Sequence, residues 1–291
     1  MRDGFINFLK PPGMSSHDAV SHVRRVLGLK KAGHAGTLDP GAAGVLPIAV
    51  GRATRLLEYV GGTRKSYRAE LRFGVETDSG DDLGEIMEHR DAPMPDGGNL
   101  ARAVQSLTGE ISQTPPVYSA VKIGGRRACD LARQNAEVEV PSRRVTIYRL
   151  EILMQNEKAK KLLLDVDCSK GTYIRSICRD LGRAAGVPAT MSFLVRTCVG
   201  DFSLDAAHTP EELSALGEAA VEPPEKYLGH LTRYDLPEMR IKAFLNGLPT
   251  HIEGLSGTAG PLAVFSGGTF LGIGRYDEKA ASLSPEKVYK S

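Results

Sequence analysis

Residues 33–47 constrain this chain more than any other stretch. They read Gly-His-Ala-Gly-Thr-Leu-Asp-Pro-Gly-Ala-Ala-Gly-Val-Leu-Pro, so four glycines and two prolines surround a single aspartate. This composition excludes a regular helix and predicts a backbone of tight turns. The segment is also unusually apolar for a solvated turn, so we expect much of it to be buried. Asp39 is therefore a carboxylate held in place among apolar groups, and it requires a partner to remain ionised.

Two other interpretations start from the same loop. An Asp-Pro pair flanked by glycines is by itself typical of an ordinary surface turn. Gly36 and Gly41 also have the spacing of a phosphate-binding loop. That loop requires Lys and then Ser or Thr after the second glycine, and Ala42 and Ala43 stand there instead. A nucleotide-binding loop is therefore excluded.

Length and hydropathy indicate the broad class of protein. At 291 residues the chain exceeds a typical single domain, which favours one large core with a small appended domain. No apolar run approaches the roughly 18 residues of a membrane helix, and residues 1–9 lack the apolar stretch of a signal peptide. We expect a cytoplasmic protein without a membrane partner.

Charge and cysteine placement point toward a polyanion and away from a metal. Residues 1–72 hold 12 Lys and Arg against 5 Asp and Glu, and residues 111–200 hold 15 against 8. Basic blocks of this kind supply phosphate contacts, although charge runs are more often solvated faces. The four cysteines show neither Cys-x-x-Cys pairing nor a histidine at ligand spacing, so we expect free thiols and no metal site.

Periodicity predicts a mixture of strands and helices. Residues 65–73 alternate apolar and charged side chains, as a half-buried strand does, and residues 145–154 and 162–168 read as two further strands. Ser15 and Asp18 form a capping box before a helix. The acidic, proline-containing residues 201–225 are consistent with a connecting segment, and β-like runs follow at 261–265 and 269–276.

Six motifs in chain order resemble those of the TruB family of tRNA pseudouridine synthases. They are Lys-Pro-Pro-Gly-x-Ser-Ser from Lys10, Gly-His-x-Gly-x-Leu-Asp-Pro from Gly33, Lys-Ser-Tyr from Lys65, Pro-Pro-x-x-Ser-Ala-x-Lys from Pro115, Gly-Thr-Tyr-Ile-Arg from Gly171, and the Leu-x-Arg segment at Leu194. None of them is decisive alone. Together they span about two thirds of the chain and are highly specific for that family.

The resemblance implies a role for individual residues. Asp39 would be the catalytic nucleophile, Arg175 its ion-pair partner, and Tyr67 a ring packed on the target base that takes part in proton transfer from carbon 5. His34 would contact the rearranged RNA loop. The other implied substrate or RNA contacts are Lys10, Arg126, Arg127, Tyr173 and Leu194. From the residues alone, the plain interpretations are favoured for Tyr67, as a core tyrosine, and for His34, as a hydrogen-bonded loop histidine. Arg175 is as readily an exposed helix arginine as an ion-pair partner.

The implied fold is α+β, with a mixed, mainly antiparallel central sheet flanked by helices and a small, mostly β, PUA-like C-terminal domain. We expect a catalytic domain over residues 1–225, an RNA-contacting arm at about 115–145, and a PUA-like RNA-binding domain over 226–291. The implied reaction converts uridine 55 of the tRNA T stem-loop to pseudouridine by flipping the base out, without a cofactor, in a monomer that needs no protein partner.

Two other classes of function remain open. One is an RNA-binding or RNA-folding protein without chemistry, against which the presence of both Asp39 and Arg175 argues. The other is a metal-free hydrolase using Asp39 and His34. It is disfavoured because neither a Gly-x-Ser-x-Gly elbow nor a suitable pair of carboxylates accompanies them.

Overall fold

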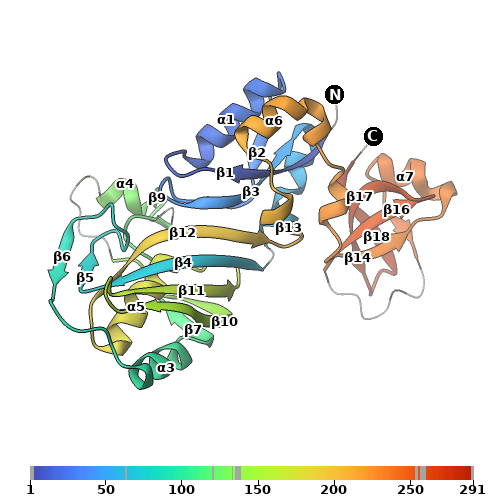
Figure 1. Cartoon of the computed structure of the whole chain (residues 1–291). Helices are drawn as coiled ribbons and strands as arrows, with labels where there is room; N and C mark the ends of the chain where they lie inside the picture. The colour runs from blue at the N-terminus through green and yellow to red at the C-terminus, as the bar shows by residue number, and fades with distance from the viewer. Residues whose placement is uncertain are drawn as a thin grey trace.

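The structure is a computed structural model that describes residues 3–62, 64–119, 121–132, 134, 139–252, 255 and 260–289, with Arg127 described by its backbone only. Its larger sheet has nine strands in the described residues (Figure 1). They are β1 (Gly4–Lys10), β2 (Ala32–His34), β3 (Ala43–Val50), β4 (Lys65–Phe73), β7 (Gly109–Gln113), β10 (Arg143–Asn156), β11 (Lys161–Cys168), β12 (Ala189–Val199) and β13 (Phe202–Ser203).

The strands of this sheet lie in the order β1-β3-β12-β4-β11-β10-β7, with β2 paired to β3 and β13 to β12. Every pairing is antiparallel except that of β12 with β3, in which Val195 and Arg196 lie opposite Ala43 and Gly44. The mixed, mainly antiparallel sheet of the expected α+β fold is therefore confirmed. The parallel contact brings two segments about 150 residues apart in sequence together directly beside the loop of Asp39.

Helices cover one face of the sheet. In Figure 1, α1 (Ser16–Val26) and α6 (Pro210–Leu216) lie beside β1 and β3, while α5 (Ile174–Ala185) packs against β12 and β4, and α3 (Gly97–Ser106) packs against α5. The remaining helices are α2 (Leu57–Gly61), α4 (Ala128–Ala132) and α7 (Ile241–Leu245), with 3₁₀ turns at Gly51–Leu56, Leu204–Ala206, Gly217–Ala220, Pro224–Tyr227 and Glu238–Arg240. The predicted capping box is confirmed: Ser15 and Asp18 each bond to the other's backbone at the start of α1.

The burial of the strands explains how the layers pack. In β4 the residues alternate between buried and more exposed positions along the strand, so one face of β4 packs beneath the helices. In β3, by contrast, all seven residues from Gly44 to Val50 are buried. Leu46 and Ile48 belong to the core under the helices, whereas Val45 and Ala49 belong to a second core on the opposite face.

That second core joins the C-terminal part to the larger sheet. The C-terminal part is a five-stranded sheet in the order β14-β16-β17-β18-β15, formed by β14 (Thr232–Asp235), β15 (Thr250–His251), β16 (Pro261–Ser266), β17 (Thr269–Asp277) and β18 (Ser282–Val288). It has a core of its own, which includes Phe244, Leu262 and Val264. Phe270 and Tyr289 pack with Phe5 of β1 in the shared core, so the two parts have continuous apolar packing. The mostly β character expected for this region is confirmed.

The interpretation of residues 201–225 as a connector missed how firmly they pack. Thr209 begins α6 with a capping box, and Leu213 is fully buried in the main core. Glu222 also exchanges two backbone hydrogen bonds with Phe5. Two of the acidic side chains that suggested a linker, Glu211 and Glu212, are exposed positions of this short helix, and a seven-residue helix is too short for its period to stand out.

Two small hairpins extend from the large sheet. One pairs β5 (Val75–Thr77) with β6 (Ile86–His89), and the other pairs β8 (Lys122–Ile123) with β9 (Arg126–Arg127). The second hairpin lies within the expected arm at 115–145, of which residues 120, 133 and 135–138 lie outside the described part. None of the helices described is both long and apolar enough to cross a membrane.

Candidate active site

The loop that presents Asp39 is held from below by side chains on β1 and α1. Ser16 forms a reciprocal pair with Leu38: its hydroxyl donates to the Leu38 carbonyl over 3.0 Å and accepts from the Leu38 N–H over 2.9 Å. The Lys10 ammonium donates to the carbonyls of Met14 at 2.6 Å, Pro11 at 3.0 Å and Pro40 at 3.3 Å. Because these bonds satisfy backbone groups on both sides of Asp39, the turn predicted from glycine and proline is fixed in one conformation.

A buried arginine holds the same loop from the opposite side. Arg196 of β12 is only 1% exposed, and its guanidinium donates to the carbonyls of Val45 at 2.7 Å, Gly36 at 3.2 Å and Thr37 at 3.4 Å. In the described part of the chain no carboxylate pairs with it. Glycine at position 44 permits this close packing, because a Cβ there would lie 2.2 Å from the Arg196 carbonyl oxygen. The backbone of Gly44 also has a φ of +115°, which other residues rarely adopt. The Arg196 guanidinium therefore orients the backbone of the Asp39 loop, and it does not neutralise a carboxylate in the described part of the chain.

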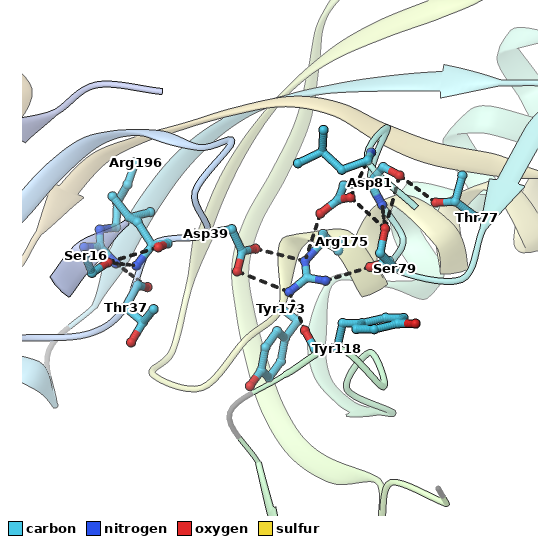
Figure 2. A network of polar contacts seen from close by, with 12 residues as sticks. Ser16, Thr37, Asp39, Thr77, Ser79, Asp81, Tyr118, Tyr173, Arg175 and Arg196 are labelled. Atoms are coloured by element: carbon cyan, nitrogen blue, oxygen red, sulfur yellow. Dashed lines mark hydrogen bonds and ion pairs between the residues drawn. The ribbon is translucent and has the colours of Figure 1, made fainter. Parts of the chain in front are cut away.

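Asp39 meets a cation, as the sequence argument required. Arg175 Nε lies 2.9 Å from Asp39 Oδ2, and Arg175 Nη2 donates to Oδ1 over 3.3 Å (Figure 2). The Nε contact is electrostatic rather than a regular hydrogen bond, because Nε has no acceptor at a suitable angle. Asp39 is 37% exposed and Arg175 only 5%, so the arginine is buried behind a carboxylate that stays accessible. The expected ion pair is present.

Arg175 is itself held by groups beyond Asp39. Its Nη1 donates to the Ser79 carbonyl at 2.7 Å and its Nη2 to the Tyr118 carbonyl at 3.0 Å. Asp81 Oδ2 lies 3.8 Å from Nε, on the side away from Asp39 in Figure 2. These contacts come from the turn after β5 and from the segment before β8, so three parts of the chain determine where the guanidinium points.

Tyr67 is the second buried residue of β4, after Lys65, and it pairs with Arg196 of the neighbouring strand β12. It is 7% exposed, and it shares a hydrogen bond with the Arg196 guanidinium. Burial raises the pKa of the Tyr67 phenol, whereas the Arg196 charge acts in the opposite direction. Asp39 is close enough to act on the same phenol. Arg196 therefore links the tyrosine to the backbone of the Asp39 loop.

The other residues expected at the base pocket lie around this centre. Leu194 is buried on β12. His34 ends β2, and burial lowers the pKa of its imidazole, helped by the charge of Arg196. Tyr173 stands at the start of α5, next to Arg175 in Figure 2, and the Arg143 guanidinium lies 4.8 Å from its ring centre.

Three expected RNA contacts differ in how far the structure describes them. Lys10 has no exposed surface, since its ammonium faces the three carbonyls given above, so in this structure it positions the loop and does not face solvent. Arg126 is exposed on the β8–β9 hairpin and donates to the Gln134 side chain over 2.6 Å. The side chain of Arg127 lies outside the described part.

Sequence reasoning missed Arg196, Asp81 and Lys65 as parts of this site. Arg196 falls in the motif at Leu194 and Lys65 in the motif with Tyr67, but nothing in either motif indicates that these two side chains are buried beside Asp39. Asp81 is one of three aspartates in residues 77–84 and belongs to none of the six motifs. Only the contact of β12 with β3 and the folding of the 77–84 turn onto α5 distinguish these residues from ordinary charged ones.

The site contains no evident metal centre: across the described ranges, no group of three or more His, Cys, Asp or Glu side chains is arranged to hold an ion. The four cysteines are free thiols, as predicted.

Comparison with solved structures and family models defines the class of protein. The chain superposes on a protein of the Cbf5-Nop10-Gar1 complex with a TM-score of 0.76 and 26% identity, covering 99% of this chain and 85% of that chain. It matches equally a chain of an H/ACA RNP bound to a substrate RNA containing 2′-deoxyuridine, with a TM-score of 0.75, 25% identity and the same coverage. The model of the N-terminal domain of TruB family pseudouridylate synthases matches residues 24–174. Fold and family model together define a pseudouridine synthase, an isomerase.

Proteins with similar sequences identify the family within this class of enzymes. The chain is 51% identical to the tRNA pseudouridine synthase B of Symbiobacterium thermophilum over 84% of this chain and 82% of that protein. It is 44% identical to the tRNA pseudouridine synthase B of Geobacillus kaustophilus over 88% and 94%. The model of the tRNA pseudouridylate synthase B C-terminal domain matches residues 175–233. The chain belongs to the TruB family.

Proposed function

We propose that this enzyme converts uridine to pseudouridine at position 55, in the T stem-loop of tRNA. The observation that carries the proposal is the ion pair of Asp39 with a buried Arg175, on a loop whose backbone is held on both sides. The relatives named tRNA pseudouridine synthase B support tRNA as the substrate, and the neighbour bound to a substrate RNA supports a fold that receives RNA.

The reaction requires the bond from ribose C1′ to uracil N1 to break and a bond from C1′ to carbon 5 to form, after which carbon 5 loses a proton and N1 gains one. Asp39 is the nucleophile: its ionised carboxylate can bond to the electron-poor sugar carbon or add to the uracil ring. Arg175 directs the oxygens of Asp39, because two of its nitrogens contact the two carboxylate oxygens.

Tyr67 packs against the uracil and takes part in removal of the carbon 5 proton. Its phenol oxygen accepts a hydrogen bond from the Arg196 guanidinium, and this positive charge favours, against the effect of burial, the phenolate form that can take up the proton. Leu194, buried on the adjacent strand, forms an apolar wall of the same pocket.

The target base has to leave the stacked loop before Asp39 can reach it, and flipping requires groups that replace its stacking. His34, five residues before Asp39, holds the rearranged RNA loop, and Tyr173 lines the pocket. The basic hairpin with Arg126 and Arg127 belongs to an RNA-contacting arm at about 115–145. Residues 1–225 then form the catalytic domain and residues 226–291 a PUA-like RNA-binding domain.

The test is the substitution Asp39→Asn, which keeps the size of the side chain and removes its charge. We expect pseudouridine formation on a T stem-loop transcript to be abolished and RNA affinity to change by less than about threefold. Exposed Asp205 supplies the matched control Asp205→Asn, which should leave both quantities unchanged. Chemical mapping of the product from the unsubstituted enzyme should place the modified uridine at position 55.

The outcomes separate the alternatives. Full activity of the Asp39→Asn enzyme would exclude the nucleophile assignment. If the unsubstituted enzyme binds the RNA and forms no pseudouridine at any position, a binding or folding protein without chemistry becomes the better conclusion. Modification at a different uridine would contradict the assignment to position 55 and leave the assignment of pseudouridine formation standing.

A further inference from the structure

A second lysine lies under the Asp39 loop and has no part in the chemistry above. Lys65 is the first residue of β4, lies on the same face as Tyr67, and pairs with Cys168 of β11 and Val199 of β12. It is only 9% exposed. Its ammonium reaches the start of the catalytic loop, because a Cβ placed on Gly36 would lie 3.1 Å from Lys65 Nζ.

This ammonium lacks the partners that buried cations normally have. Within the residues that the structure describes, Lys65 Nζ has neither a hydrogen-bond acceptor nor a carboxylate partner, whereas the fully buried Lys10 has three carbonyls. The carboxylate nearest along the neighbouring strand, Asp167, is already engaged by Arg64 and Arg149. The Lys65 ammonium keeps some contact with solvent, because it is not among the fully buried polar atoms that lack a partner, and a largely buried cation of this kind favours the approach of an anion.

The groups around Lys65 add positive charge and do not neutralise its ammonium. The place that a Cβ would take on Gly36 lies 3.1 Å from Lys65 Nζ and 3.8 Å from Arg196 Nη1, so two buried cations converge on one point. The other charged or titratable groups acting on the ammonium are Cys168 and the exposed Lys170. Burial, followed by repulsion from Arg196, lowers the pKa of Lys65 to about 8.

We propose that Lys65, with Arg196 behind it, forms a subsite for one phosphodiester group of the bound RNA, next to the flipped nucleotide. This rests on the proposed function, because RNA brings only one kind of anion, the phosphate, to a site that holds an excess of buried positive charge. Gly36 lies two residues after His34 and three before Asp39, so a phosphate there would flank the nucleotide at Asp39. The absence of a side chain on Gly36 leaves the ammonium open to it.

The substitution Lys65→Met tests the subsite, because methionine fills a similar volume without charge. RNA affinity is measured in the Asp39→Asn background, so that turnover does not alter the ligand. We expect the Kd for a T stem-loop RNA to rise about tenfold or more, as for the loss of a charge-assisted hydrogen bond. The slope of log K against log salt should fall by about 0.7–0.9. Lys158→Met is the matched control, since Lys158 is exposed in the turn at the far end of β11.

A neutral methylphosphonate, moved one linkage at a time through the loop of the RNA, identifies the phosphate. At one linkage adjacent to the target uridine the unsubstituted and Lys65→Met proteins should bind equally, while at the others the tenfold difference should persist. Deprotonation of Lys65 should also weaken RNA binding as the pH rises through about 8 in the protein with lysine, and not in the methionine variant.

Thermal stability distinguishes a ligand site from a structural lysine. If Lys65 is held for the RNA, Lys65→Met relieves an unpaired buried charge, and the midpoint of unfolding without RNA should rise. A lowered midpoint with unchanged affinity and salt slope would overturn the subsite, and so would a tenfold difference that survives at every methylphosphonate position. Either result leaves the proposed function standing if the unsubstituted enzyme still modifies the RNA, so the two can fail separately.

Discussion

Arg196 should be the most sensitive structural residue of the site, because it holds the Asp39 loop as well as contacting the Tyr67 phenol. Its guanidinium is the only side chain that contacts the loop both before and after Asp39, at Gly36, Thr37 and Val45, among the contacts described. The informative pair of variants is Arg196→Met, which removes the charge and every donor, and Arg196→Lys, which keeps the charge but cannot reproduce the planar fork.

The three hydrogen bonds of Arg196 give the expected loss of stability in Arg196→Met. The Nε bond to Val45 is short, at 2.7 Å, and counts for about 2 kcal/mol, while the bonds of 3.2 and 3.4 Å are near the upper limit and count for about 1 kcal/mol each. Removal of the buried charge returns part of this gross loss of about 4 kcal/mol. We expect Arg196→Met to lower the free energy of unfolding by about 2–4 kcal/mol, or the unfolding midpoint by about 5–10 °C.

The effect on turnover should exceed the effect on stability. Release of the carbonyls of residues 36, 37 and 45 lets Asp39 move, and a displacement of about 1 Å can cost a hundredfold in rate. Single-turnover pseudouridine formation, measured well below the new midpoint, should therefore fall about a hundredfold in Arg196→Met and less in Arg196→Lys. Arg90→Met, which removes an exposed ion pair with Glu88, is the control and should change neither quantity appreciably. If Arg196→Met unfolds within 2 °C of the unsubstituted protein and turns over within threefold, Arg196 does not hold the loop.

Two further predictions follow from the same contacts. Gly44→Ala should destabilise the protein by about 3 kcal/mol or more in urea unfolding, because its φ is +115° and the new Cβ would lie 2.2 Å from the Arg196 carbonyl oxygen. Gly41→Ala, whose Cβ would meet only Leu83 at 3.5 Å, should cost less than about 1 kcal/mol, and equal costs would contradict the packing argument. The stability gained by Lys65→Met should be largest below pH 8 and should shrink between pH 8 and 10.5. The unfolded chain binds a proton at Lys65 in that window, whereas the folded chain, with a pKa of about 8, has released it. A gain that does not change with pH would show that Lys65 has the same pKa in the folded and unfolded chains, so that burial does not disfavour its charge.

Local sequence patterns predicted the structure correctly where the residues that determine it all lie in one segment. The glycine and proline spacing around Asp39 predicted a fixed turn, and the structure shows how Ser16 and Lys10 hold it. Alternation at residues 65–73 predicted a strand with one buried face, and β4 has that face. The requirement of Asp39 for a cation was also derivable, because the cost of a partly buried carboxylate does not depend on the fold.

Contacts between distant segments could not be predicted in this way. Arg196 looks like any strand arginine until β12 lies parallel to β3, and Lys65 looks like the exposed first residue of a strand until Gly36 and Cys168 close over it. Both are charged residues whose burial contradicts their ordinary preference. The same disagreement between residue type and burial makes them informative once a structure is available.

The acceptors that the buried cations use explain how the site keeps its charge for the substrate. Lys10 and Arg196 donate to backbone carbonyls, which are dipoles and leave each cation's net charge in place, and Lys65 has no described partner at all. Only Arg175 meets a full negative charge, and that charge belongs to Asp39, which remains 37% exposed. Had carboxylates replaced those carbonyls, the loop would be equally rigid and the site electrically neutral. Fixing the loop with carbonyls instead gives Asp39 a rigid backbone and, at the same time, leaves uncompensated positive charge where an RNA phosphate can supply the missing anion.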